Sequence, residues 1–176
     1  MLRGERTGLR ARHDSDIPVL HAQLYDDVAT RVRADSRPWR PIPPGSGSPY
    51  AVAGPDDHAA CFSVVELVTG ELAGEALLWG IDLHNRSAHI GIALLPAFRG
   101  RGLGTDVVRV LCRYGFAIRG LHRLQAETLA DNDAMIHAAS RAGFAPEGTL
   151  RRAAWVNGRF ADEVIFGLLE TEWEAS

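Results

Sequence analysis

A short segment rich in arginine and glycine, LLPAFRGRGLGTD (residues 94–106), carries residue types suited to binding an anion. Its relevant residues are Arg99, Gly100, Arg101, Gly102 and Gly104. Glycine allows a ligand to approach the backbone closely, and arginine adds charge-assisted hydrogen bonds. An apolar run precedes the segment and a helical pattern follows it. Because the first N–H groups of a helix have no partner inside the helix, this arrangement predicts a phosphate site.

Two familiar phosphate motifs do not fit this segment. The dinucleotide pattern G-x-G-x-x-G fails because Thr105 and Val107 stand where its last glycine is needed. The nucleoside-triphosphate loop requires a lysine, and all 19 basic residues of this chain are arginines. The absence of lysine also excludes a lysine Schiff base. The pattern that fits is R-x-x-G-x-G, formed by Arg99, Gly102 and Gly104.

This pattern resembles the pyrophosphate-binding motif of the GNAT superfamily of acyl-CoA-dependent N-acyltransferases. The surrounding LLPAFRGRGLGTDVV is similar to that family's strand–turn–helix segment almost position by position. The C-terminal half resembles the branch of ribosomal-protein N-terminal acetyltransferases. The residues that carry this second resemblance are Asn132, Gly143, Phe144, Glu147, Gly148, Asn157, Gly158, Asp162, Glu172 and Trp173.

The resemblance implies an α/β (α+β) fold with a mixed, mostly antiparallel sheet flanked by helices, formed by residues 1–176 as a single domain. Two strands, one ending at Leu95 and one in HRLQAETLA (residues 122–130), would splay apart and hold acyl-CoA. The thioester would bond to the backbone near Ala93 and Leu94. Asn132 would contact the pantetheine arm, with a plain helix cap as the alternative. The pyrophosphate would lie on Arg99, Gly100, Arg101, Gly102, Leu103, Gly104 and Thr105.

The family chemistry is direct transfer of the acyl group, most simply acetyl, to a primary amine. The ammonium must first lose a proton, and a base within reach speeds this step. Relatives in this branch often carry an acidic residue where this chain has His89. Imidazole has an ordinary pKa near 6.5 and is a competent base. Strand alternation places His89 on one face with Gly91 and Ala93, the cleft face if Ile90, Ile92 and Leu94 turn toward the helices.

Alternatives remain open for the catalytic residues. His89 can be a structural strand histidine, with Glu75, Glu127 or water as the base. Met135 stands where many relatives carry a serine, and methionine has no proton to give to the departing sulfur. Tyr114 is expected in the core by its helical spacing. Because no covalent intermediate is needed, we expect Cys61 and Cys112 to be core residues as well.

The function classes are limited by composition. The net charge of −3 gives no basic footprint for nucleic acid. No apolar run approaches the ~20 residues of a membrane helix, and the N-terminus lacks a signal-peptide core. The two cysteines have no metal-ligand spacing, so no metal is expected. We expect a cytoplasmic protein, monomer or homodimer, that uses acetyl-CoA and acts on a small-molecule amine or a peptide or protein N-terminus.

The elements that must position these residues follow from periodicity and turn signals. Expected are a helix after Asp14 or Ser15, antiparallel strands around Thr69–Gly70, a strand before Pro96, a helix from Leu103 to Gly120, a strand at 122–130, a helix at 132–143 and a hairpin around Asn157–Gly158. On the long helix, Asp106, Arg109 and Arg113 are predicted opposite the apolar face formed by Val107, Val110, Leu111, Tyr114 and Ile118. The proline-rich segment 36–50 is irregular.

Acceptor specificity is open at this stage. Trp39, Arg40, Tyr50 and Trp79 are candidates to line the acceptor side, and Arg40 or Arg151 can pair with the carboxylate of a longer acyl group such as succinyl. Two further functions compete with transfer. One is an acyl-CoA-binding module that has lost its amine chemistry, and the other is a regulatory domain for another phosphate ligand.

Overall fold

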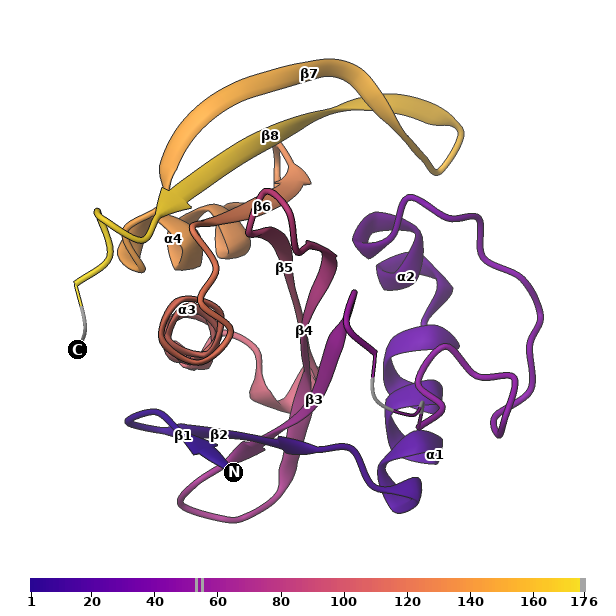
Figure 1. Cartoon of the computed structure of the whole chain (residues 1–176). Helices are drawn as coiled ribbons and strands as arrows, with labels where there is room; N and C mark the ends of the chain where they lie inside the picture. Colours follow the sequence, from indigo (N-terminus) through magenta and orange to yellow (C-terminus); the bar gives the residue numbers. More distant parts are fainter. Residues whose placement is uncertain (53, 55, 175–176) are drawn as a thin grey trace.

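One eight-stranded sheet organises the chain. The computed structural model describes residues 1–52, 54 and 56–174. The strand order is β1-β2-β3-β4-β5-β6-β8-β7 (Figure 1). The strands are β1 (Leu2–Arg3), β2 (Thr7–Ala11), β3 (Ala60–Glu66), β4 (Leu72–Asp82), β5 (Ser87–Leu94), β6 (Arg123–Leu129), β7 (Ala145–Val156) and β8 (Arg159–Leu169). Only β5 and β6 are parallel neighbours, so the predicted mixed, mostly antiparallel sheet is confirmed.

Helices cover both faces of the sheet. The short α1 (Ile17–Leu20) and α2 (Val28–Ala34) lie on one face, and α3 (Leu103–Arg113) and α4 (Asp133–Arg141) lie on the other (Figure 1). Short turns of other helix types extend them: η1 (Asp14–Asp16), η2 (His21–Tyr25), η3 (Pro96–Phe98) and η4 (Tyr114–Ile118). Alternate strand residues such as Leu78, Ile90 and Leu124 are buried in the core. No helix among the described residues is long and apolar enough to cross a membrane.

The parallel pair β5–β6 is joined over only a short stretch. Ser87, Ala88 and His89 pair with Arg123, Leu124 and Gln125. Beyond His89, β5 stays paired with β4 alone and β6 with β8 alone. The two strands therefore diverge toward the carboxyl end of β5, and the predicted splayed pair is confirmed.

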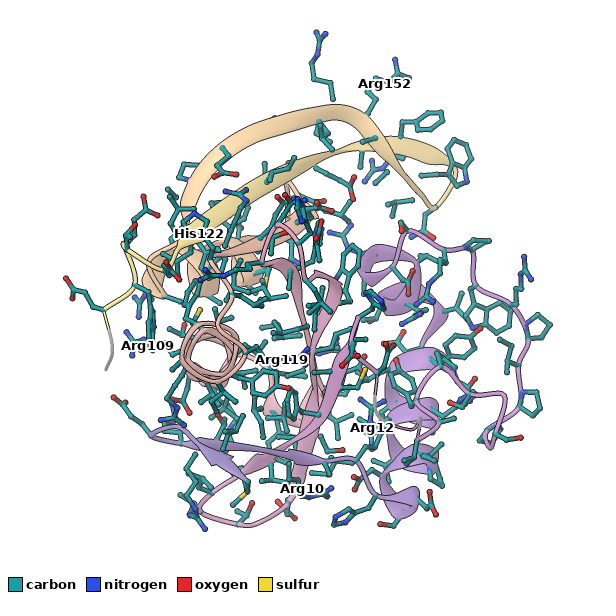
Figure 2. The ribbon with its side chains drawn as sticks, viewed as in Figure 1. Arg10, Arg12, Arg109, Arg119, His122 and Arg152 are labelled. Carbon is teal, nitrogen blue, oxygen red and sulfur yellow. The ribbon has the colours of Figure 1, made fainter. Side chains whose placement is uncertain are left out.

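The predicted turns lie where glycine and asparagine placed them. Gly70 has φ +75°, between the antiparallel β3 and β4. Asn157 and Gly158 have φ +47° and +82°, the left-handed pair that a two-residue hairpin loop requires. The hairpin β7–β8 arches over one end of the sheet, and Arg152 projects outward from it (Figures 1 and 2).

Four expectations about single positions were wrong. Asp106 is buried rather than exposed, because it receives hydrogen bonds from the N-terminal segment. Ile118 is 56% exposed, since α3 ends at Arg113 and η4 continues with a wider turn that shifts the helical phase. Cys61 is exposed, while Cys112 is buried and its pKa is raised to about 12 by burial. The first helical turn is capped by His13, not by Asp14 or Ser15.

Two elements had not been predicted at all. The strand β1 is only two residues long, and α2 has no buried residue, so neither leaves a clear hydrophobic period in the sequence. Asp27 caps α2 by accepting a hydrogen bond from the Thr30 N–H at 3.2 Å.

Candidate active site

The glycine-rich segment forms an open cradle between the end of β5 and the start of α3. After η3 the chain turns through Gly100 and Gly102, with φ +69° and +75°, and α3 begins at Leu103. The N-cap residue of α3 is Gly102, which has no side chain with which to cap the helix. A Cβ at Gly100 would meet no atom of the described residues within 4 Å. Space next to Gly100 is therefore open beside the first turn of the helix, and the anion site predicted there stays a prediction.

The two arginines of the cradle point in different directions. Arg99 donates from Nε to the Leu94 carbonyl at 2.8 Å, which holds its exposed side chain beside the carboxyl end of β5. Arg101 is paired with the buried carboxylate of Glu66, and it lies over the Phe98 ring at 5.3 Å. The Arg101 side chain is thus engaged within the protein, which leaves Arg99 as the side-chain cation beside the end of β5.

The cradle is braced by the N-terminal segment. Asp106, in the first turn of α3, accepts hydrogen bonds from the N–H groups of Glu5, Arg6 and Thr7 and from the Thr7 hydroxyl, at 2.6–3.0 Å. Burial raises the pKa of Asp106, but these hydrogen bonds outweigh burial and the net shift is downward. The Arg6 guanidinium donates to the Arg101 carbonyl at 2.7 Å. Arg6 is therefore a second cation at the cradle, which the sequence did not reveal because it lies 95 residues away.

The backbone of β5 alternates between its neighbour and the gap. The Leu95 N–H donates to the Ala73 carbonyl, and Ala93 is the register partner of Glu75. In an antiparallel ladder the intervening residue points its N–H and C=O to the other side. Leu94 therefore presents its backbone to the gap, while Ala93 presents its own to β4. Glycine is needed at position 74, since a Cβ there would lie 2.2 Å from the Ala93 carbonyl oxygen.

Asn132 is the N-cap of α4 on the far side of the gap. Its Oδ1 accepts from the Met135 N–H at 3.3 Å, and its Nδ2 donates to the Thr128 hydroxyl at 2.8 Å. The amide group is half-buried and keeps a second N–H for a ligand. Met135, in the same turn, packs against the core.

His89 lies where the two splayed strands separate. It pairs with Trp79 of β4 on one side and with Gln125 of β6 on the other. Ile92, in contrast, faces α3, since a Cβ at Gly104 would lie 3.6 Å from its side chain. The His89 side chain is therefore on the sheet face opposite α3, as alternation predicts. Its ring stacks on the Trp79 indole, with centroids 4.2 Å apart and planes 22° apart.

Glu127 of β6 lies beside His89, and Glu163 of β8 lies close enough to Glu127 for their charges to interact. Glu127 Oε1 lies 3.4 Å from His89 Nδ1, within ion-pair range but not aligned as a hydrogen bond. Burial, and then the charge of Glu127, raise the pKa of Glu163. The Gln125 side chain donates a hydrogen bond to the Glu127 carboxylate. Arg123, on the same strand, is paired with Glu147. The contact between His89 and Glu127 joins residues 38 positions apart, because β5 and β6 are neighbours in the sheet.

A second ionised cluster lies further along the same sheet face, under α1 and α2. Glu75 pairs with Arg12 at 2.8 Å, and burial raises the pKa of Glu75 although Arg12 opposes the shift. Arg12, visible between α1 and β3 in Figure 2, also lies over the Tyr50 ring at 5.6 Å. Tyr50 is buried, so it supports this cluster rather than an open cleft.

The remaining candidates for the acceptor side are dispersed. Trp39 packs against the core and donates to the Tyr25 carbonyl at 3.1 Å, whereas Trp79 is 42% exposed beside His89. Arg40 and Arg151 are exposed on separate elements. Within the described residues, no three His, Cys, Asp or Glu side chains are grouped so as to hold a metal ion.

Comparison with known proteins agrees with this geometry. Residues 6–145 match the family model of the acetyltransferase (GNAT) domain. The chain belongs to the GNAT acetyltransferase family. The match includes both the cradle and the splayed strands, so the resemblance seen in the motif is confirmed for most of the chain.

Individual relatives share about a third or less of the residues in the aligned segments. The chain is 35% identical over 108 residues to "Putative ribosomal N-acetyltransferase YdaF" of Bacillus subtilis, a match covering 61% of this chain and 59% of that protein. It is 28% identical over 106 residues to spermidine N(1)-acetyltransferase of Escherichia coli, covering 60% and 57%. The matched segments thus span less than two thirds of these relatives. The spermidine N-acetyltransferase of Vibrio cholerae, solved with CoA and spermine, has the same fold, with a TM-score of 0.78 at 20% identity over 96% of this chain and 98% of that one.

Proposed function

We propose that this protein transfers an acyl group, acetyl in the simplest case, from acyl-CoA to a primary amine. The observation that carries the proposal is the gap between β5 and β6, which opens directly onto the unfilled N-terminus of α3. A thioester with a phosphorylated tail fits this arrangement, because the tail needs N–H donors and the acyl end needs a slot between strands. The proposal treats residues 1–176 as one catalytic domain, acting in the cytoplasm as a monomer or homodimer.

The donor lies along the gap in this proposal. Its pyrophosphate accepts from the N–H groups between Gly100 and Thr105, and Arg99 adds a charge-assisted bond. The Leu94 N–H, which faces the gap, donates to the thioester carbonyl. Asn132 contacts the pantetheine arm from the opposite wall.

The transfer uses His89 as the base. His89 takes a proton from the acceptor ammonium, and the neutral amine then attacks the carbonyl carbon of the thioester. A C–N bond forms, the C–S bond breaks and sulfur leaves with the electron pair. Of the two protons lost by nitrogen, one ends on the CoA sulfur and the other enters solvent. Met135 gives no proton, so sulfur leaves as the thiolate and is protonated afterwards.

The acceptor is a primary amine of a small molecule or of a peptide or protein N-terminus. The two kinds of named relative, one ribosomal and one specific for spermidine, support both classes. The exposed Trp79 ring and the Glu127 carboxylate favour a cationic acceptor beside His89.

A catalytically impaired acyl-CoA-binding module is the second candidate. Two residues favour it: His89 stands where relatives often have a carboxylate, and Met135 stands where many have a proton-donating serine. The glycine-rich cradle motif is nevertheless intact.

The test is thiol release from acetyl-CoA and from succinyl-CoA with a panel of polyamines, small amines and short peptides, with CoA binding measured in parallel. We expect CoA to bind and at least one amine to be acylated. CoA binding without turnover across the panel would select the binding module. No CoA binding would overturn both candidates.

A further inference from the structure

The buried edge of the His89 ring carries an unusual atom. His89 Nδ1 is one of two buried side-chain nitrogen or oxygen atoms, among the described residues, that have no hydrogen-bond partner; the other is Arg12 Nε. A buried polar atom without a partner costs about 1–3 kcal/mol, so such an atom next to a candidate site requires an explanation. The acceptor placed to receive a proton from Nδ1 is Glu127 Oε1, 3.4 Å away.

The opposite edge of the ring is kept open. The His89 side chain is 29% exposed although Nδ1 is buried, so the exposure belongs to the rest of the ring. The Cδ2–Nε2 edge faces Gly80, where a Cβ would lie 3.3 Å from Cδ2 and 3.9 Å from Nε2. Position 80 has no side chain to cover that edge. Nε2 is therefore the nitrogen that a substrate proton can reach.

A neutral imidazole carries its proton on one nitrogen and accepts on the other. For Nε2 to accept the amine proton, Nδ1 must carry the hydrogen. We propose that Glu127 is the positioning residue of the base: it binds the Nδ1 hydrogen of His89, selects the tautomer with Nε2 free, and stabilises the imidazolium after proton transfer. Trp79 holds the plane of the ring from the other side. This inference rests on the proposed function, in which His89 is the base.

The Glu127 carboxylate is itself held in place by a hydrogen bond. Gln125 donates to the same oxygen, Oε1, that lies beside Nδ1. The charged group that lies beside His89 is Glu127 on β6. The β4 residues Trp79 and Gly80, which also lie against the ring, do not titrate. Arg123, on the same strand as Glu127, is paired with Glu147 on β7. Burial, and then the charge of Glu127, raise the pKa of Glu163 on β8. Glu127 is thus the carboxylate next to the ring whose charge is available to the imidazolium.

The chain contains a matched control. His122 Nδ1 lies 3.4 Å from Glu170 Oε1, the same pair of atoms at the same distance. Both side chains are solvent-exposed, His122 lies just before β6 (Figure 2), and Glu170 is also paired with Arg86. Glu170→Gln therefore removes a histidine–glutamate contact outside the cleft.

The first readout is the tautomer of His89, measured by ¹⁵N NMR of the imidazole nitrogens in the protein without substrate. The chain has seven histidines, and the signals of His89 are identified among them by their loss in His89→Asn. We expect hydrogen on Nδ1 in the wild type, and a substantial Nε2–H population in Glu127→Gln but not in Glu170→Gln. Hydrogen on Nε2 in the wild type would overturn the role of Glu127, whatever the protein acylates.

The second readout is kinetic, with acetyl-CoA and the best amine of the panel. Glu127→Gln should lower kcat by about 10-fold or more, up to the full 10²–10⁴-fold contribution of a base, and change KM for acetyl-CoA little. In a His89→Ala background the same substitution should have no further effect. An equal loss in both backgrounds would show that Glu127 acts on the substrate directly. If the tautomer is as expected and no amine is acylated, the proposed function fails while the histidine–glutamate pair stands.

Discussion

The donor end and the acceptor end of this site are built in opposite ways. The proposed donor end, from Leu94 to Asp106, is one continuous segment whose proposed ligand groups are mostly backbone N–H groups at a helix terminus. The proposed acceptor end joins Trp79, His89 and Glu127 from three different strands, and its proposed ligand groups are side chains. The first is a local structure, and the second exists only because the sheet has this register.

The contrast explains how one fold serves different acceptors. A cradle made of backbone tolerates few changes, because glycine is required where φ is positive. A corner made of side chains can change its chemistry by single substitutions without moving the strands. His89 in place of an acidic residue is such a change, and we expect it to alter the base without altering the donor site.

Removing the base should produce the largest effect, because it should stop turnover at the acceptor end while leaving CoA binding at the donor end unchanged. We expect His89→Ala to lower kcat by about 10²–10⁴-fold while CoA binds as before, because the side chain faces the sheet side away from the cradle. Steady-state rates and CoA titration measure the two quantities. The variant should also lose the acid limb of the pH–rate profile, which reports protonation of the base. A variant with the wild-type profile would assign the base to Glu75, Glu127 or water.

Substitutions of the two arginines of the cradle test which of them contributes to CoA binding at the donor end. Arg99→Glu should weaken CoA binding by about 10–100-fold, since a charge-assisted bond contributes about 1.5–3 kcal/mol and reversal adds repulsion. Arg101→Gln is the matched control, because the Arg101 side chain is paired with Glu66. It should lower stability and leave CoA affinity nearly unchanged. Equal losses of affinity in both variants would mean that Arg101 leaves Glu66 when the ligand binds.

The same contrast decides what the sequence could predict. The R-x-x-G-x-G segment, the Asn157–Gly158 hairpin and the caps of α4 are local patterns, and each lies where it was predicted. The splayed pair followed from the family resemblance. Strand alternation placed His89 on its face, which the structure confirms, whereas its catalytic role stays a prediction.

Long-range pairings were beyond local patterns. Asp106 looked like an exposed helix residue, because nothing near it in sequence shows that the N–H groups of residues 5–7 fold back onto it. The Arg12–Glu75 pair spans 63 positions, and the Glu127–His89 contact depends on strand register. The sequence shows only an acidic residue in the first helical turn, which suits the helix dipole whether it faces solvent or another segment.

Substitution of Asp106 tests how much the hydrogen bonds between this residue and the N-terminal segment stabilise the protein. Asp106→Asn places N–H donors against N–H donors and should cost about 1–3 kcal/mol of unfolding free energy at pH 7. The pKa of Asp106 is lowered in the folded state, so its stabilisation is complete above the ordinary carboxyl pKa near 4 and is lost as pH falls through the folded value. The difference from wild type, measured by denaturant unfolding, should therefore shrink below about pH 4. Asp133→Asn, an exposed first-turn aspartate of α4, is the control with a smaller and salt-sensitive effect. A difference that is constant with pH would contradict the assigned hydrogen bonds.

Asn132 gives the smallest expected effect and separates a structural cap from a ligand contact. Asn132→Ala should lower stability by about 1 kcal/mol, the usual cost of losing an N-cap. Asn132→Ser restores a capping oxygen but not the amide N–H, so its stability should return to near the wild-type value. If the free N–H of the amide binds pantetheine, CoA affinity of both variants should remain about 2–10-fold weaker, the value of one neutral hydrogen bond. Wild-type CoA affinity in Asn132→Ser would make Asn132 a cap alone, and the wall of the gap opposite Leu94 would then hold the donor without it.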